Sequence, residues 1–295
     1  MERIINETEY TDVGMKKCIR ELKKQYSFLR SFSVGQSCMG REIPALVLGS
    51  GEYCLFTAGF GGTERLTSNI LLMFAEELCS SLKNNISLAG ININKALERK
   101  GIIIVPRVNP DGAEIALLGA SAAGAYSKEI RRISNNNTEN WNANLRGVEI
   151  RRNFSADWTA LRETERAAGV FAPRPVGYGG PYAESEPETA ALTALCQRLN
   201  ISHSLSLFCG DSVIYWQYGD KLPLCSQKMA MALAQAGNLR CDALGNCSSG
   251  GSLKDWFIDT FNRPAFNIHI QPDAVHTCYK SYGEIRKMLA VASIL

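Results

Sequence analysis

The four consecutive apolar residues 102–105, Ile-Ile-Ile-Val, constrain the fold of this chain more than any other feature. A strand without polar residues is typical of a sheet whose two faces are both covered by helices. Such strands alternate along the sequence with segments whose apolar residues have helical spacing. The predicted strands lie within 40–49 and at 54–60, 102–105, 205–208, 213–216 and 265–270, and the predicted helices lie at 15–29, 67–82, 185–199, 222–236, 253–261 and 282–295. This alternation predicts a single α/β domain that spans residues 1–295.

Composition excludes several classes of partner. The 295 residues are 45% apolar and 21% charged, which is ordinary for a globular protein. The formal net charge of +3 gives little attraction to nucleic acid or to an anionic membrane surface, so we expect no nucleic-acid partner. No apolar run reaches the ~18 residues of a membrane span.

Cysteine usage and the start of the chain both favour a cytoplasmic protein. The ten cysteines are scattered, and none forms Cys-x-x-Cys, which argues against a disulfide framework or a zinc ribbon. Residues 1–7, Met-Glu-Arg-Ile-Ile-Asn-Glu, lack the apolar stretch of a signal peptide. We therefore expect a reducing, cytoplasmic location.

Two polar motifs have simple local interpretations. Asn109-Pro110-Asp111-Gly112 is typical of a turn after a buried strand. Ser185-Glu186-Pro187-Glu188 predicts a helix start, with Ser185 and Glu188 as a capping box and Pro187 in the first turn.

Six segments in a fixed order carry a family resemblance. They are residues 34–43; residues 107–112; residues 141–154, which end in Arg151-Arg152-Asn153-Phe154; residues 185–189; residues 250–257; and the strand 265–270. Together they resemble the M14 zinc carboxypeptidase family, and most of all its bacterial branch, which includes γ-D-glutamyl-diaminopimelate peptidases that act on cell-wall peptides. The resemblance implies a single-domain metallocarboxypeptidase-like fold, with a mixed, twisted sheet of about eight strands and helices on both faces. It carries no evidence of activity, because function depends on the residues of the site.

The resemblance also implies that two of the three zinc ligands are replaced. Such enzymes hold zinc with three protein ligands and leave a fourth position open for water. The first two ligands form His-x-x-Glu; Glu64 keeps the glutamate position, but Gly61 stands at the histidine position and has no side chain. The third ligand position falls on Phe208, because His203, the first histidine of the chain, lies five residues too early. A single carboxylate would leave water to complete the coordination, so we expect no bound metal cofactor.

The catalytic base of the family is replaced as well. The resemblance implies a glutamate in the strand 265–270, where this chain has His269. Histidine accepts protons, but water that no metal activates has a pKa near 15.7, so we do not expect His269 to act as the base. The arginine that activates the substrate falls on Asn142, and the carboxylate that orients the first histidine falls on Glu149.

Substrate recognition is the part of the site that the sequence retains. The family's Asn-Arg-Asn-Phe segment holds the terminal carboxylate of the substrate, and here it reads Arg151-Arg152-Asn153-Phe154. Two neighbouring guanidiniums favour a carboxylate or another anion through bidentate hydrogen bonds. Alternatively, one arginine faces solvent or pairs with a structural acid such as Glu149.

These substitutions predict a non-catalytic member of the family that binds a peptide or a small anionic ligand. Two enzymatic alternatives stay open. In the first, Glu64, Cys209 and His269 hold a metal, or Cys209 and His269 form a nucleophile–base pair. In the second, the protein is an active zinc carboxypeptidase or γ-D-glutamyl-diaminopimelate peptidase, and only His203, His269 and His276 are available as imidazole ligands for its zinc.

Overall fold

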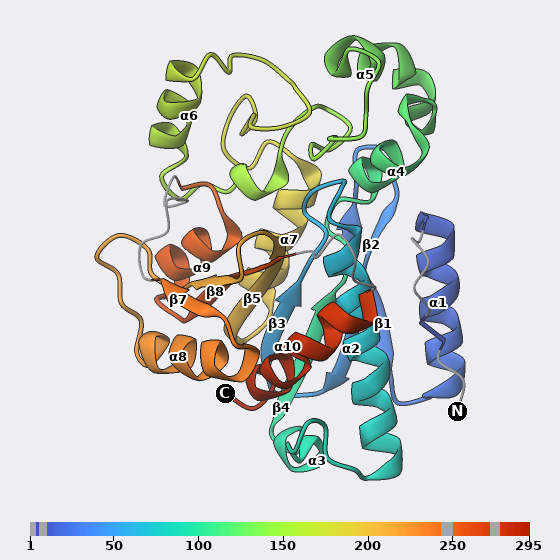
Figure 1. Cartoon of the computed structure of the whole chain (residues 1–295), viewed down its shortest axis with the longest axis vertical. Helices are drawn as coiled ribbons and strands as arrows, with labels where there is room; N and C mark the ends of the chain where they lie inside the picture. Colours follow the sequence, from blue (N-terminus) through green and yellow to red (C-terminus); the bar gives the residue numbers. More distant parts are fainter. Residues whose placement is uncertain (1–3, 6–10, 243–249, 272–277) are drawn as a thin grey trace.

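Eight strands form one mixed sheet in the computed structural model, which describes residues 4–5, 11–242, 250–271 and 278–295 (Figure 1). The strands are β1 (Arg30–Gln36), β2 (Glu42–Gly49), β3 (Glu52–Thr57), β4 (Lys100–Val105), β5 (Ile201–Cys209), β6 (Val213–Tyr215), β7 (Arg240–Asp242) and β8 (Ala265–Ile270). Their order across the sheet is β1-β2-β4-β3-β5-β8-β6-β7. The central strands β4, β3, β5 and β8 run parallel, whereas β2 and β6 join them antiparallel. The carboxyl ends of the parallel strands therefore meet at one edge of the sheet, where α/β proteins bind their ligands.

Helices cover both faces of this sheet. The longer helices are α1 (Asp12–Gln25), α2 (Arg65–Asn84), α4 (Pro110–Leu118), α5 (Ser127–Ser134), α6 (Trp158–Ala167), α7 (Pro187–Arg198), α8 (Ser226–Gly237), α9 (Leu253–Phe261) and α10 (Cys278–Ala292), and the short ones are α3 (Ile93–Ala96), η1 (Ala120–Tyr126) and η2 (Ile150–Arg152). Helices α1, α2, α8 and α10 pack into the apolar core on one face, and α7 and α9 pack into the core on the other. Within β4, Ile102 and Ile104 enter the first core while Ile103 and Val105 enter the second, which explains why this stretch carries no polar residue.

A lobe of loops and short helices adjoins the carboxyl edge of the sheet. Figure 1 shows its helices α4, α5 and α6 at the top of the view, above the central strands. The lobe has a small core of its own around Ile115, Ile130 and Trp141. The loop after β3 touches it closely, because a Cβ on Gly62 would lie 2.3 Å from the carbonyl oxygens of Gly112 and Trp141. This loop is thus fixed between the sheet and the lobe.

The predicted architecture is confirmed, with a mixed sheet and helices on both of its faces. Several helix boundaries differ by a few residues, and two of these differences have a local reason. The predicted helix 15–29 begins earlier, at Asp12, because the hydroxyl of Thr11 accepts from Gly14 N and caps the helix. The predicted helix 222–236 begins later, at Ser226, because Cys225 has a left-handed backbone with φ of 65°. Among the described helices, none is both long enough and apolar enough to cross a bilayer.

Candidate functional site

Glu64 lies at the carboxyl edge of the sheet, in the loop between β3 and α2. It is 6% exposed and stands at the N-cap of α2, but its side chain does not cap that helix. Its Oε2 atom instead accepts a hydrogen bond of 3.0 Å from the backbone N–H of Gly61. Burial raises the pKa of the Glu64 carboxyl, and the positive charge of Arg151 opposes that rise. The carboxyl group is therefore held within its own loop, close to a cation.

Asn142 occupies the space that a side chain at position 61 would need. A Cβ on Gly61 would lie 2.5 Å from Asn142 Oδ1 and 3.2 Å from Glu64 Cγ. Asn142 Oδ1 is fixed by Thr63, whose hydroxyl and backbone N–H donate to it over 2.5 Å and 3.2 Å. Position 61 therefore has neither a side-chain ligand nor room for one while Asn142 keeps this conformation.

Phe208 and His269 are neighbours on the parallel strands β5 and β8. Their rings lie 5.4 Å apart, and Phe208 also packs 5.2 Å from the ring of Phe60. His269 stands edge-on to Tyr215 at 5.1 Å, and a Cβ on Gly210 would come within 2.5 Å of His269 Nδ1. Burial is the main cause that lowers the pKa of His269 to about 4. The imidazole is thus neutral at pH 7 and packed among aromatic rings.

Cys209 follows Phe208 on β5 but points to the other face of the sheet. In the parallel register Cys209 pairs with Ile270, whereas Phe208 pairs with His269, and side chains alternate along each strand. Burial, with a contribution from Glu64, raises the pKa of the Cys209 thiol to about 12. A protonated thiol is a poor nucleophile. Both observations argue against a Cys209–His269 catalytic pair.

Arg151, in the short helix η2, is paired with a buried acid. Its Nε atom donates to the carboxylate of Glu149, and 34% of the Arg151 side chain is exposed. The Arg151 charge acts on the pKa values of Glu64, Cys209 and His269, so the guanidinium lies within electrostatic reach of all three. Arg151 therefore contributes to the structure through Glu149 while its charge faces the predicted site.

Arg152, the next residue, is paired with Glu165 of α6. Its Nε atom donates to Glu165 Oε1 over 2.8 Å, and Arg162 Nη1 binds Oε2 of the same carboxylate. The side chain of Glu165 is 2% exposed and that of Arg162 is 6% exposed, whereas 25% of the Arg152 side chain reaches solvent. Within the described residues, Nη1 and Nη2 of Arg152 have no hydrogen-bond partner. The outer edge of this guanidinium is accordingly available to an anion.

Asn153 is fully buried and its side chain is engaged within the protein. Nδ2 donates to the carbonyl oxygens of Gly179 and Tyr182 and to Ser185 Oγ, at 2.8, 3.2 and 3.0 Å. Oδ1 accepts from the backbone N–H of Glu186 at 3.1 Å. Because an amide nitrogen carries only two hydrogens, these contacts leave none for a ligand. Asn153 thus ties the chain at 179–185 to the start of α7.

His203 lies at the beginning of β5, where it pairs in register with Cys54 of β3. Its Nδ1 atom is 2.8 Å from Ser202 Oγ, and its Nε2 atom is 2.9 Å from the carbonyl oxygen of Ala292. Burial lowers the pKa of His203 to about 4. With both ring nitrogens occupied, this is a structural histidine at the other end of the strand from Phe208. His276 lies outside the described residues.

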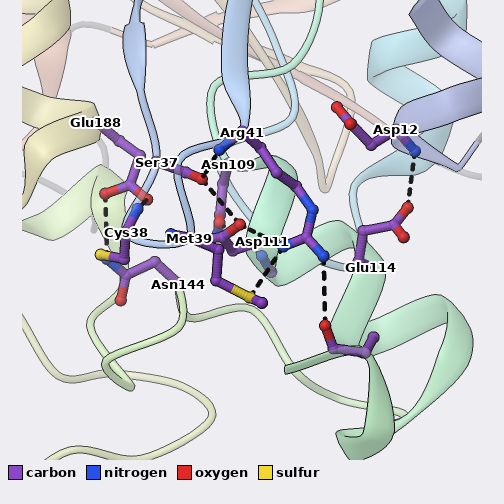
Figure 2. Close-up of polar contacts among 12 residues, drawn as sticks. Asp12, Ser37, Cys38, Met39, Arg41, Asn109, Asp111, Glu114, Asn144 and Glu188 are labelled. Carbon is purple, nitrogen blue, oxygen red and sulfur yellow. Dashed lines mark hydrogen bonds and ion pairs between the residues drawn. The ribbon is translucent and has the colours of Figure 1, made fainter. Parts of the chain in front are cut away.

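A second group of titratable side chains was not predicted from the sequence. Ligand atoms of Cys38, Asp111 and Glu188 all lie within 4.8 Å of one another, a spacing that suits a shared metal ion (Figure 2). Asp111 and Glu188 are fully buried, at the N-terminal turns of α4 and α7. Both acids belong to motifs that the sequence indicates as a turn and a helix start. The sequence does not indicate that these two motifs lie close together in the fold.

Asp111 in this group is held by three donors. Ser37 Oγ, Met39 N and Arg41 Nη1 donate to its carboxylate over 2.8, 2.9 and 2.5 Å, and Figure 2 shows all three converging from the turn between β1 and β2. The Arg41 guanidinium also donates to the carbonyl oxygen of Ala122 at 3.3 Å. These contacts join the turn to α4 and to η1.

Glu188 in this group shares a donor with Glu186. Asn144 Nδ2 lies 2.7 Å from Glu186 Oε2 and 3.2 Å from Glu188 Oε2, and Cys38 N donates to Glu188 at 3.4 Å. Burial raises the pKa of Glu188 to about 7. Burial and the neighbouring acids also raise the pKa of the Cys38 thiol. The group is therefore a hydrogen-bonded join between α4, α7 and two loops.

The raised pKa of Glu188 predicts a pH-dependent stability. A carboxyl that titrates at about 7 when folded and at 4.5 when unfolded makes the folded state bind more protons between these values. The stability that this carboxyl contributes is fully present below pH 4.5 and is lost as the pH rises through about 7. We expect Glu188→Gln to flatten the fall in melting temperature between about pH 5 and pH 8. The exposed Glu98→Gln should leave the profile as in the unmodified protein, and an equally steep profile for Glu188→Gln would refute the assignment.

Comparisons with known proteins bear on the family. The family model described as zinc carboxypeptidase, Peptidase_M14, matches residues 15–287. γ-D-Glutamyl-L-diamino acid endopeptidase 1 of Lysinibacillus sphaericus is 28% identical over 272 residues, which cover 91% of this chain and 67% of that protein. Human carboxypeptidase Z is 26% identical over 270 residues, which cover 81% of this chain and 39% of that protein.

Solved structures show the same fold. Carboxypeptidase A from Helicoverpa armigera matches with a TM-score of 0.71 at 16% identity, covering 97% of this chain and 73% of that one. Murein-tripeptide amidase MpaA from Escherichia coli O157 matches with a TM-score of 0.56 at 21% identity, covering 90% of this chain and 92% of that one. Likeness at these identities concerns the fold alone, whereas the family model covers nearly the whole chain. The chain belongs to the M14 zinc carboxypeptidase family.

Proposed function

We propose that this protein is a non-catalytic member of the zinc carboxypeptidase family that binds the carboxylate end of a peptide or another small anion. The observation that carries the proposal is at position 61. The resemblance assigns a zinc-binding histidine there, and this chain has a glycine whose side-chain space is filled by Asn142. The rest of the donor set points the same way.

The side chains at the predicted metal position do not fit zinc. Zinc needs three protein ligands of the nitrogen, sulfur or carboxylate type. Gly61 and Phe208 provide no donor atom, and Phe208 is packed against Phe60 and His269. Glu64 alone has a ligating group, and its carboxylate is bonded to the backbone of its own loop. A zinc ion bound by this one carboxylate would be held far more weakly than in a three-ligand site.

The candidate site also lacks a group that would activate water as the nucleophile for hydrolysis. His269 stands where the family has its glutamate base, and its pKa of about 4 keeps it neutral at pH 7. A neutral imidazole accepts a proton, but it would have to take one from water whose pKa no metal has lowered. The Asn142 amide likewise has no charge with which to polarise a substrate carbonyl.

Anion recognition rests on Arg151 and Arg152. The two arginines are consecutive in η2, and the Nε atom of each is bonded to a buried carboxylate, Glu149 for Arg151 and Glu165 for Arg152. Such pairing fixes the direction of a guanidinium, which lowers the entropy lost when it binds a ligand. A peptide carboxylate would then meet charge-assisted hydrogen bonds from the exposed edge of Arg152.

Metal analysis tests the loss of the zinc centre. Protein purified without chelator is expected to hold well below one zinc per chain at neutral pH, because only Glu64 is available to bind it. About one zinc per chain, tightly held, would refute the proposal.

Calorimetry with a short peptide tests the anion site independently of the metal. We expect the peptide with a free C-terminal carboxylate to bind about tenfold more tightly than its amidated twin, since a charge-assisted hydrogen bond contributes roughly 1.5–3 kcal/mol. Arg152→Met should remove this preference. Arg166→Met, which changes an exposed arginine of α6, should preserve it. Equal affinity of the two peptides for the unmodified protein would contradict carboxylate recognition.

The main alternative is an active zinc carboxypeptidase or γ-D-glutamyl-diaminopimelate peptidase. It is favoured by the 28% identity to a γ-D-glutamyl-L-diamino acid endopeptidase over 272 residues. Chelator-sensitive hydrolysis of a γ-D-glutamyl-diaminopimelate substrate would establish it. A rebuilt site that uses Cys209 and His269 would instead give hydrolysis that resists chelators and is abolished by Cys209→Ala.

A further inference from the structure

A second pocket lies between the start of β1 and the end of α7. Its volume is about 450 Å³, within the range of small-molecule sites. Its floor is formed by Val47, Tyr53 and Ile103 of the sheet. Tyr53 stands near the amino end of β3, so the pocket is at the opposite end of the sheet from Glu64. It is therefore separate from the site described above.

Strand β1 and helix α7, which both contribute residues to the pocket, touch each other closely at Gly35. A Cβ on Gly35 would lie 2.6 Å from Ala191 Cβ, so the strand and the helix touch there as closely as two backbones with small side chains allow. Toward the other end, β1 begins at Arg30 and α7 stops at Arg198. Phe32, in the first half of β1, is 41% exposed and lines the pocket together with Leu195 and Leu199 from the end of α7.

Two arginines stand at the mouth of this apolar pocket. Arg30 Nη2 donates to the carbonyl oxygen of Gly49 at 2.5 Å, and Arg198 Nε donates to that of Ala194 at 3.1 Å. Each hydrogen bond fixes the direction of its guanidinium, but a carbonyl oxygen does not neutralise the positive charge. Within the described residues, neither forms an ion pair with a carboxylate, and no acidic residue lines the pocket. Arg41 and Arg286, in contrast, are both paired with acids.

We propose that this pocket binds an amphipathic carboxylate, a molecule with an apolar chain and one terminal carboxylate. The chain would lie on Phe32 and Ile103, where its burial is favourable. The carboxylate would stay at the mouth, where Arg30 and Arg198 offer charge-assisted hydrogen bonds from two sides. An anion without an apolar chain would leave the apolar walls in contact with water, and an apolar molecule without a charge would make no charge-assisted hydrogen bond with either arginine. The pocket is thus complementary to both halves of such a ligand.

Titration calorimetry with octanoate tests the proposal. Octanol, which has an alkyl chain of the same length but no charge, is the neutral probe. The unmodified protein is expected to bind octanoate about tenfold more tightly than octanol, which corresponds to ~1.4 kcal/mol of interaction with the arginines. The double variant Arg30→Met/Arg198→Met should bind both probes equally. Arg20→Met, an exposed arginine of α1 that does not line the pocket, should bind them as the unmodified protein does.

A second variant guards against non-specific association of the probe. Leu199 lines the pocket and is only partly buried, so Leu199→Trp is expected to fill the space, and an unchanged melting temperature would show that the core beside it is intact. It should abolish the binding of octanoate and of octanol alike. The proposal is overturned if octanoate does not bind, or if inorganic phosphate binds as tightly as octanoate. It is also overturned if neither the double arginine variant nor Leu199→Trp changes the affinity for octanoate. None of these results depends on the metal content of the predicted active site.

Discussion

Replacing Glu165 with glutamine is expected to lower the free energy of unfolding by about 3–5 kcal/mol, the cost of breaking a buried ion pair from one side. This carboxylate is bonded to both Arg152 and Arg162, and it also accepts from the backbone N–H of Gly179 at 3.1 Å. Glutamine has almost the same shape but no charge. The substitution would leave the Arg162 guanidinium, 6% exposed, without its counter-ion.

Urea denaturation of the purified variant measures this loss. The matched control is Glu163→Gln, which makes the same chemical change on the exposed side of α6 and should alter stability by less than about 0.5 kcal/mol. A similar small effect at Glu165 would show that the charge of the buried carboxylate contributes little. The substitution should also weaken the proposed anion binding, because the buried carboxylate would no longer hold the Arg152 guanidinium in a fixed direction.

Restoring the missing imidazoles is expected to raise the zinc content from well below one to about one ion per chain. The variant combines Gly61→His and Phe208→His with Asn142→Ala, which clears the space beside position 61. Together with Glu64 it offers the two histidines and one glutamate that are typical of a catalytic zinc site. Metal analysis after dialysis against zinc and then against zinc-free buffer measures the retained ion.

The single substitution Gly61→His provides the control for this restoration. With Asn142 in place, the new side chain meets an amide oxygen already bonded to Thr63, so we expect low zinc retention and a stability loss of about 1–3 kcal/mol from overpacking. Retention of about one zinc by this single variant would mean that ligands other than Phe208 complete the site. Failure of a folded triple variant to hold zinc would show that the surrounding geometry has also changed.

Periodicity and local chemistry predicted most of the fold. The apolar run 102–105 indicated a strand buried on two faces, and β4 enters both cores. The capping box at Ser185 was wrong, because the side chain of Ser185 does not cap α7. The helix begins one residue later, and the backbone N–H of its N-cap residue, Glu186, donates to Asn153 Oδ1 across 33 residues of sequence. A cap that comes from another segment leaves no local signal in the helix that it serves.

The sequence predicted where the candidate site residues lie in the fold, but not which residues their side chains contact. The segments that carry Glu64, Phe208 and His269 do meet at the carboxyl edge of the sheet, as alternation of strands and helices predicts. The contact of Asn142 with Gly61 could not be foreseen, because it depends on a loop from the lobe. Neither could the pairing of Arg152 with Glu165, since nothing in the charge pattern distinguishes this glutamate from the exposed Glu163 of the same helix.

The two adjacent glycines after β3 differ in how firmly their surroundings exclude a side chain. Gly62 meets backbone oxygens on two sides, so no substitution there is tolerated without moving the lobe. Gly61 meets a side chain instead, and the present position of Asn142 is incompatible with a larger residue at 61. Asn142 reaches position 61 only with the end of its side chain, so a rotation of that side chain would make room for a larger residue at 61. Backbone atoms therefore fix the identity of Gly62, whereas a single amide group that can rotate limits position 61.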